Sequence, residues 1–282
     1  MRLGYNTNGF AHHDVFAAVE VLAALGYESI ALALDHGPLN PFAAGFEAQL
    51  TKMRALLERK NLRCVIETGA RYLLDPWEKH EPTLVSADPA GRNRRIAFLR
   101  AAVDAAVALN ADCVSLWSGV DRLGASRAET LHRLVGGLYE IIGYAADKNI
   151  AIGFEPEPGM VIATVADYME LAEKLNHPAF QLTLDIGHLH CQGETPIAEA
   201  IRRVGSKIVN VHLEDMRSGV HEHLLFGEGE IDFTPIFAAL KDIQYSYGVH
   251  VELSRHSHAA PSVAATMMQL LRKLRENPTD VG

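Results

Sequence analysis

Four short apolar stretches in the second half of the sequence each end on a carboxylate or an imidazole. Within residues 181–184, apolar and polar side chains alternate with the period of a strand, and the alternation stops at Asp185. The stretches that precede Glu155, His212 and Glu252 end in the same way. Metal-capable side chains at the ends of four strands predict that these strands share one site.

The whole chain repeats a unit of one strand followed by one helix. Strands are expected at residues 3–5, 27–34, 63–68, 113–117, 150–155, 181–184, 208–213 and 249–253. Helices are expected at residues 14–25, 42–60, 94–110, 126–148, 164–176, 195–204, 233–243 and 259–275. Eight such units predict an α/β protein, a (β/α)8 TIM barrel that forms a single domain over residues 1–282.

Two other architectures are compatible with a chain of 282 residues: two separate domains and a doubly wound open sheet. An open sheet would spread its strand ends along a line, whereas a barrel brings them together on one face. The first strand is followed by neither a Gly-x-Gly-x-x-Gly motif nor a Walker loop. The pattern therefore favours the barrel.

Two segments lack the periodicity of a helix or strand and are predicted to be long loops on the catalytic face. Residues 69–93 contain Pro76, Pro82 and Pro89, and residues 214–232 contain Gly219, Gly227 and Gly229. Loops of this length in compact domains are usually functional. The first loop is expected either to cover the barrel mouth or to contact a second subunit.

Charge, cysteine count and hydrophobicity argue against a nucleic-acid-binding, a disulfide-rich or a membrane protein. The net charge is −9, and the densest basic group, from Arg92 to Arg95, is interpreted as the solvated start of a helix, so nucleic acid is not the expected partner. Three cysteines make a disulfide framework improbable and fit a reducing compartment. The sequence shows no signal peptide and no apolar run long enough for a membrane span, so a cytoplasmic location is expected.

The four strand-end residues Glu155, Asp185, His212 and Glu252 are spaced by 30, 27 and 40 residues, about one strand-helix unit each. Three carboxylates and one imidazole suit one divalent cation of intermediate hardness, such as Mn²⁺, Mg²⁺, Co²⁺ or Zn²⁺. Each residue alone has an ordinary structural explanation, such as a turn cap or a core histidine. Their coincidence at four strand ends favours the metal site.

Other residues near these strand ends are candidates for binding a substrate. His188, three residues after Asp185, could contribute to metal binding or hold substrate oxygens, and substrate contact is favoured. Arg217 could clamp a substrate oxygen or be a solvent-facing loop arginine, and Trp117 could stack on a sugar face. His221 and His223 flank a glutamate in the second loop. They could supply a second metal site or could be surface histidines.

The sequence resembles the xylose-isomerase-like barrels known as sugar-phosphate isomerases and epimerases. The resemblance lies in Glu155, Asp185-x-x-His188, His212-Leu-Glu-Asp, the segment 227–232 and Glu252. The resemblance covers nearly the whole chain. It implies that Glu155, Asp185, His212 and Glu252 bind the metal. It also implies that Glu155 and Glu252 are catalytic, one removing a proton beside a carbonyl and the other returning it through an enediolate that the metal stabilises.

This resemblance leads us to expect a metal-dependent isomerase or epimerase of a small sugar, with a homo-oligomer as a family-level possibility. A dehydratase acting on an inosose or keto sugar is an alternative, because the same enediolate can expel a β-hydroxyl. An endonuclease IV-like phosphodiesterase is a second alternative, but the third and fourth strands lack the histidines of a three-zinc cluster. A sugar-binding barrel without activity is the third.

Overall fold

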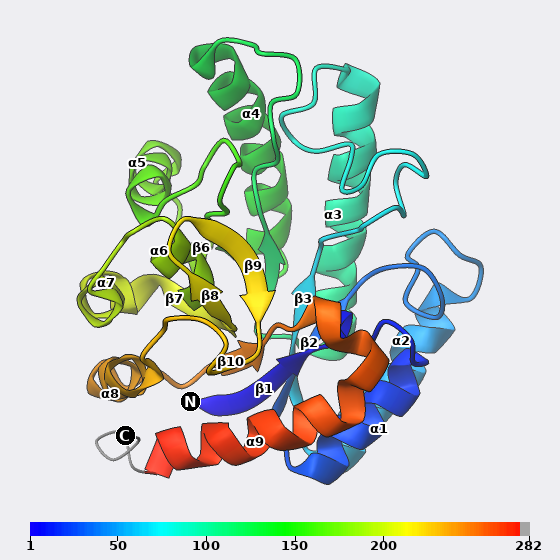
Figure 1. Ribbon diagram of the computed structural model, residues 1–282. Coiled ribbons are helices and arrows are strands. Elements are labelled where there is room, and N and C mark those ends of the chain that lie inside the picture. The colour runs from blue at the N-terminus through cyan, green and yellow to red at the C-terminus, as the bar shows by residue number, and fades with distance from the viewer. Residues whose placement is uncertain (277–282) are drawn as a thin grey trace.

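The computed structural model describes residues 1–276 and contains a closed barrel of eight parallel strands (Figure 1). The strands are β1 (Arg2–Asn6), β2 (Ser29–Ala33), β3 (Arg63–Glu67), β4 (Cys113–Leu116), β5 (Ala151–Phe154), β6 (Phe180–Asp185), β7 (Ile208–Leu213) and β10 (Gly248–Val251). Strand β1 closes the ring by pairing with β10, where Leu3 lies opposite Val249. The predicted (β/α)8 barrel is confirmed.

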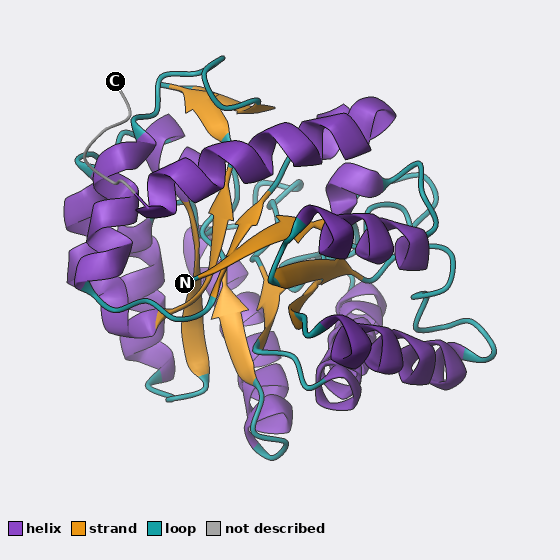
Figure 2. Cartoon of the chain, turned by 90° about the horizontal axis from the view of Figure 1, so that it is seen from below, coloured by secondary structure: helices purple, strands orange, loops and turns teal. Residues whose placement is uncertain are grey.

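Helices surround the barrel on the outside (Figure 2). They are α1 (Val15–Leu25), α2 (Phe46–Lys60), α3 (Pro89–Leu109), α4 (Arg127–Ala146), α5 (Val165–Leu175), α6 (Ile186–Cys191), α7 (Ile197–Val204), α8 (Phe233–Asp242) and α9 (Ala260–Glu276). Short 3-10 helices occupy Thr7–Phe10, Gly205–Lys207 and Ser254–Ala259. Among residues 1–276, none of the helices combines the length and apolarity that a bilayer crossing requires.

Local capping signals explain where several helices begin. Ser126 accepts a hydrogen bond from the Glu129 amide and caps the start of α4. Helix α3 begins at Pro89, earlier than the predicted residue 94, so the prediction of a helix break at this proline was wrong. Proline is well suited to the first helical position because its missing N–H would have no partner there, and Asp88 caps the following amides.

Apolar side chains fill the space between strands and helices in one large core that includes Leu3, Ile30, Ile66, Ile152 and Leu182. Four strands also contribute small buried residues to a separate cluster. Its members are Ala31, Val65, Cys113 and Val209. Neighbouring residues of a strand point to opposite sides, so Ile30 and Ala31 enter different clusters.

One residue of the basic segment at the start of α3, Arg95, departs from the sequence interpretation, whereas Arg94 is exposed as expected. Arg95 is only 1% exposed, and its Nη2 donates to the Thr68 carbonyl at 2.7 Å. Its guanidinium lies 4.6 Å from the centre of the Trp117 ring. Arg95 is therefore a packed component of the fold and not part of a solvated surface.

The predicted loop 214–232 contains an antiparallel hairpin of β8 (Asp215–Arg217) and β9 (Val220–Leu224). Asp215 explains its shape, because the buried carboxylate accepts hydrogen bonds from the amides of Met216, Gly227, Gly229 and Ile231 at 2.8–3.0 Å. A single carboxylate thereby satisfies four backbone donors and fixes the return path of the chain. The hairpin could not be predicted from the local sequence, because it depends on hydrogen bonds between Asp215 and amides up to 16 residues further along the chain.

Candidate metal centre and active site

The strand ends open into a cavity of about 390 Å³ that holds the candidate site. The first predicted loop contributes Arg71, Lys79 and His80 to its wall, whereas Trp77 of the same loop is 88% exposed. Chemically active groups thus gather at the carboxyl ends of the strands, where barrel enzymes place their active sites.

Four of the predicted site residues meet at the strand ends, and three of them, Glu155, His212 and Glu252, line this cavity. Glu155 follows β5, Asp185 ends β6, His212 lies in β7 and Glu252 follows β10. One potential ligand atom from each lies within 4.8 Å of the others. We call these four residues the carboxylate cluster.

The imidazole of His212 stands at the centre of the carboxylate cluster. Its Nδ1 lies 2.8 Å from Glu252 Oε2, 3.1 Å from Glu155 Oε1 and 3.8 Å from Asp185 Oδ2. Its Nε2 lies 2.9 Å from Glu67 Oε1 on the other side of the ring. A carboxylate in this position orients the ring and increases its basicity as a ligand.

Polar contacts continue from Glu67 into the barrel. Asn210 Nδ2 donates to Glu67 Oε1 at 3.1 Å, and Asn210 Oδ1 lies 2.8 Å from His250 Nδ1. The last contact in this series joins His250 Nε2 to Ser29 Oγ at 2.9 Å. A Cβ atom on Gly4 would lie 2.3 Å from the His250 ring, so only glycine leaves room for this imidazole. These buried contacts hold Glu67 in place behind His212.

Burial and neighbouring charges shift the pKa values of the residues in the carboxylate cluster in different directions. Burial raises the pKa of Glu155 to about 8. Burial also opposes ionisation of Glu252, but the charge of His212, its hydrogen bond to Glu252 and the nearby His223 and His188 together outweigh burial and lower the pKa of Glu252 below its usual range. For His212, burial favours the neutral ring, yet Glu67, Glu155 and Glu252 together raise its pKa. Two carboxyl groups with opposite shifts are a common basis for acid and base roles.

The donor set fits a divalent cation. Asp185 Oδ1 accepts the His188 amide at 2.7 Å, while its buried Oδ2 has no hydrogen-bond partner among the residues described. Buried polar atoms without partners are costly, and a cation would satisfy this one. Three carboxylates and an imidazole are suitable ligands for Mn²⁺, Mg²⁺, Co²⁺ or Zn²⁺.

The predicted substrate-binding residues divide into two groups. His188 and Trp117 line the cavity, and His188 Nδ1 lies 3.2 Å from the Pro156 carbonyl. Arg217 does not line it, because its side chain is exposed and donates to the Glu228 carbonyl at 3.0 Å. The hairpin turns this guanidinium outward, so the structure does not bring Arg217 to the predicted site.

Three further cavity residues were not predicted as site residues. Glu67 ends β3, Asp35 follows β2, and Asn8 donates through Nδ2 to Glu252 Oε1 at 2.6 Å. Glu67 and Asp35 carry the same signal as the predicted ligands, a carboxylate at or just after a strand end. Asn8 gives no such signal, because 244 residues separate it from Glu252.

The family can be assigned once this geometry is known. A family model described as xylose isomerase-like TIM barrel matches residues 19–274. The chain belongs to this family. An L-ribulose-5-phosphate 3-epimerase, UlaE, of Shigella flexneri is 30% identical over 186 residues, which are 65% of this chain and 65% of that enzyme. An uncharacterised protein of Methanocaldococcus jannaschii is 29% identical over 207 residues, 70% of each chain.

Two solved structures share the fold of this chain. A D-allulose 3-epimerase from Methylomonas sp. has a TM-score of 0.77 at 23% identity, with 97% of this chain and 98% of that chain covered. The IolI protein, in a crystal structure with a bound zinc atom, has a TM-score of 0.79 at 18% identity, with both chains fully covered. These similarities support the barrel and its strand order.

Proposed function

We propose that the protein is a divalent-metal-dependent isomerase or epimerase of a small sugar or related polyol-type carbonyl compound. The observation that carries this proposal is the carboxylate cluster, four ligand-type residues from four strands, of which Glu155, His212 and Glu252 line one cavity. The similarity to L-ribulose-5-phosphate 3-epimerase supports the reaction type. One cation bound by the cluster would supply Lewis-acid stabilisation of negative charge on the substrate oxygens.

In this proposal Glu155 and Glu252 transfer the proton. Glu252 is the more readily ionised of the two, and Asn8 orients its carboxylate by donating to Oε1. It is suited to remove a proton from the carbon beside the carbonyl. Glu155, whose pKa lies near 8, is suited to return a proton. An epimerisation requires the two groups to act on opposite faces of the substrate carbon, and this proposal assigns one face to Glu155, after β5, and the other to Glu252, after β10.

Other cavity residues favour an uncharged substrate. The cavity is lined by six carboxyl side chains and three cationic side chains. Two of the cations are paired, Arg71 with Asp35 and Arg255 with Glu222. A phosphodiester would meet an excess of negative charge here, whereas the hydroxyls of a sugar could hydrogen-bond to these groups. Trp117 offers a flat wall for the apolar face of a sugar, and His188 lines the same cavity.

A solvent-exchange experiment tests the proposal. Metal-free protein would be reloaded with Mn²⁺, Mg²⁺, Co²⁺ or Zn²⁺ in deuterated water and incubated with ketoses, inososes and hydroxypyruvate. Deuterium beside a carbonyl, dependent on metal and without loss of water, is the expected result. Loss of water from an inosose would instead identify a dehydratase. Absence of exchange together with cleavage of abasic DNA would overturn the proposal in favour of a phosphodiesterase.

A further inference from the structure

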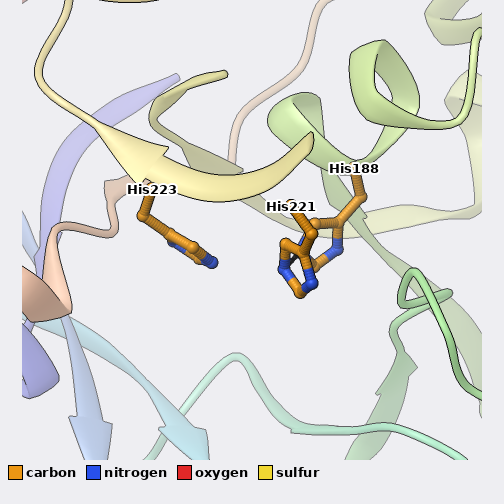
Figure 3. Close-up of side chains that lie close together, drawn as sticks. All are labelled: His188, His221 and His223. Atoms are coloured by element: carbon orange, nitrogen blue, oxygen red, sulfur yellow. Dashed lines mark hydrogen bonds between the residues drawn. The ribbon is translucent and has the colours of Figure 1, made fainter. Parts of the chain in front are cut away.

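Three histidines beside the carboxylate cluster form a second group of potential ligands, which we call the imidazole cluster. His188 lies on α6, and His221 and His223 lie on β9 (Figure 3). The three side chains point into the same space, and one ring nitrogen from each lies within 4.8 Å of the others. The ring centres of His188 and His221 are 4.7 Å apart, and those of His221 and His223 are 5.5 Å apart.

Hydrogen bonds to backbone carbonyls fix the orientation of two rings. His188 Nδ1 lies 3.2 Å from the Pro156 carbonyl, and His223 Nδ1 lies 3.1 Å from the Glu252 carbonyl. A carbonyl oxygen only accepts, so each Nδ1 carries the hydrogen and each Nε2 keeps its lone pair. A hydrogen bond of this kind behind a ring is the usual support for a metal-binding histidine.

The third ring completes the arrangement. His221 Nε2 approaches His188 Nε2 to 3.0 Å. One explanation is a hydrogen bond between the rings, in which His221 donates to the His188 lone pair. The other is that both nitrogens face a shared cation, which would also engage His223. The hydrogen bond accounts for one pair of rings, whereas a cation accounts for the convergence of all three.

We propose that His188, His221 and His223 bind a second divalent cation of borderline hardness, such as Zn²⁺ or Co²⁺. Imidazole ligands favour these ions, whereas Mg²⁺ and Mn²⁺ favour carboxylate oxygens. Three protein ligands would leave coordination positions open toward the cavity that all three histidines line. His188 would then meet substrate oxygens through the ion. This inference concerns metal binding and does not depend on the proposed reaction.

Metal stoichiometry tests the second site without reference to activity. Metal-free protein is titrated calorimetrically with Zn²⁺ and, separately, with Mn²⁺, and bound metal is measured by elemental analysis. We expect two equivalents of Zn²⁺ and one of Mn²⁺ in the unmodified chain. The double variant His221→Ala/His223→Ala should bind one equivalent of either ion. His132→Ala, which removes an exposed histidine of α4, is the matched control and should still bind two equivalents of Zn²⁺.

A second variant separates the two sites. His212→Ala removes the central imidazole of the carboxylate cluster and should retain one equivalent of Zn²⁺ at the imidazole cluster. Circular dichroism of each variant checks that the fold is intact. One equivalent of Zn²⁺ in the unmodified chain would overturn the proposal and leave the hydrogen bond between His188 and His221 as the explanation. Two equivalents in the folded double variant would also overturn it.

Discussion

The carboxylate cluster and the imidazole cluster lie side by side but are built in different ways. Four barrel strands carry the carboxylate cluster, and His212 is 1% and Glu155 5% exposed. The imidazole cluster combines one residue of the short helix α6 with two from the hairpin strand β9, and His221 is exposed. The barrel positions the first cluster directly, whereas the second depends on how a loop is held.

Their chemistry differs as much as their construction. The carboxylate cluster contains three acidic side chains, and the imidazole cluster contains only histidines. Hard cations are therefore expected at the first cluster alone, while borderline cations are expected at both. Helix α6 connects the two, because Asp185 caps it and His188 lies one turn further on. This difference predicts that each cluster can be damaged separately.

The largest effect is expected from Glu252→Gln, which alters only the carboxylate cluster. The amide cannot act as a base, so metal-dependent deuterium exchange should fall by about 10²–10⁴-fold. Exchange into the substrate is followed by nuclear magnetic resonance, and Glu170→Gln on the exposed face of α5 is the control. Unchanged exchange in Glu252→Gln would refute the role of the two glutamates.

Removing the anchor of the hairpin should affect the imidazole cluster. Asp215→Ala leaves four backbone amides without their acceptor and should lower the free energy of unfolding by about 3 kcal/mol. Affinity for Zn²⁺ at the imidazole cluster should decrease, whereas affinity for Mn²⁺ at the carboxylate cluster should be retained. Chemical denaturation and calorimetric titration measure the two effects. Equal losses for both ions would show that the clusters are not separable.

The support behind His212 should matter only for the carboxylate cluster. Glu67→Gln keeps the shape of the side chain but removes its charge, and metal affinity at this cluster should fall by about 10–100-fold. Competition with a chelator measures the affinity for Mn²⁺. Glu47→Gln, an exposed site on α2, provides the control. A parallel loss of Zn²⁺ from the imidazole cluster would contradict the assignment of Glu67.

The smallest effect is expected at His80, in the loop that borders both clusters. Burial lowers the pKa of His80, whose Nδ1 lies 2.7 Å from the Gly69 carbonyl. The folded state therefore resists protonation, so His80 should reduce stability as the pH falls below about 6.5, the ordinary histidine value, and have no effect above it. In His80→Gln, the free energy of unfolding should decrease less steeply as the pH falls below about 6.5 than it does in the unmodified chain. Identical pH profiles would show that this ring protonates as readily as in the unfolded chain.

Much of the fold and the carboxylate cluster could be predicted from the sequence. Strand and helix periods are local properties, and a carboxylate or imidazole at a strand end reaches the catalytic face once a barrel forms. Local pattern misled at two residues of α3. Pro89 was interpreted as a helix breaker although it begins α3, and the charge of Arg95 was taken as a sign of exposure although the side chain is buried beneath Trp117.

The sequence by itself determined the eight strand-helix units and the four residues of the carboxylate cluster. Tertiary structure decided which side chains support them, because barrel closure places β1 beside β10 and brings Asn8 to Glu252. Similarly, Glu67 meets His212 although 145 residues separate them. The course of the hairpin sends His221 toward the cavity and Arg217 away from it. The orientation of a side chain on the hairpin depends on contacts between segments that are distant in the sequence, and the spacing of apolar residues along a strand or helix does not encode it.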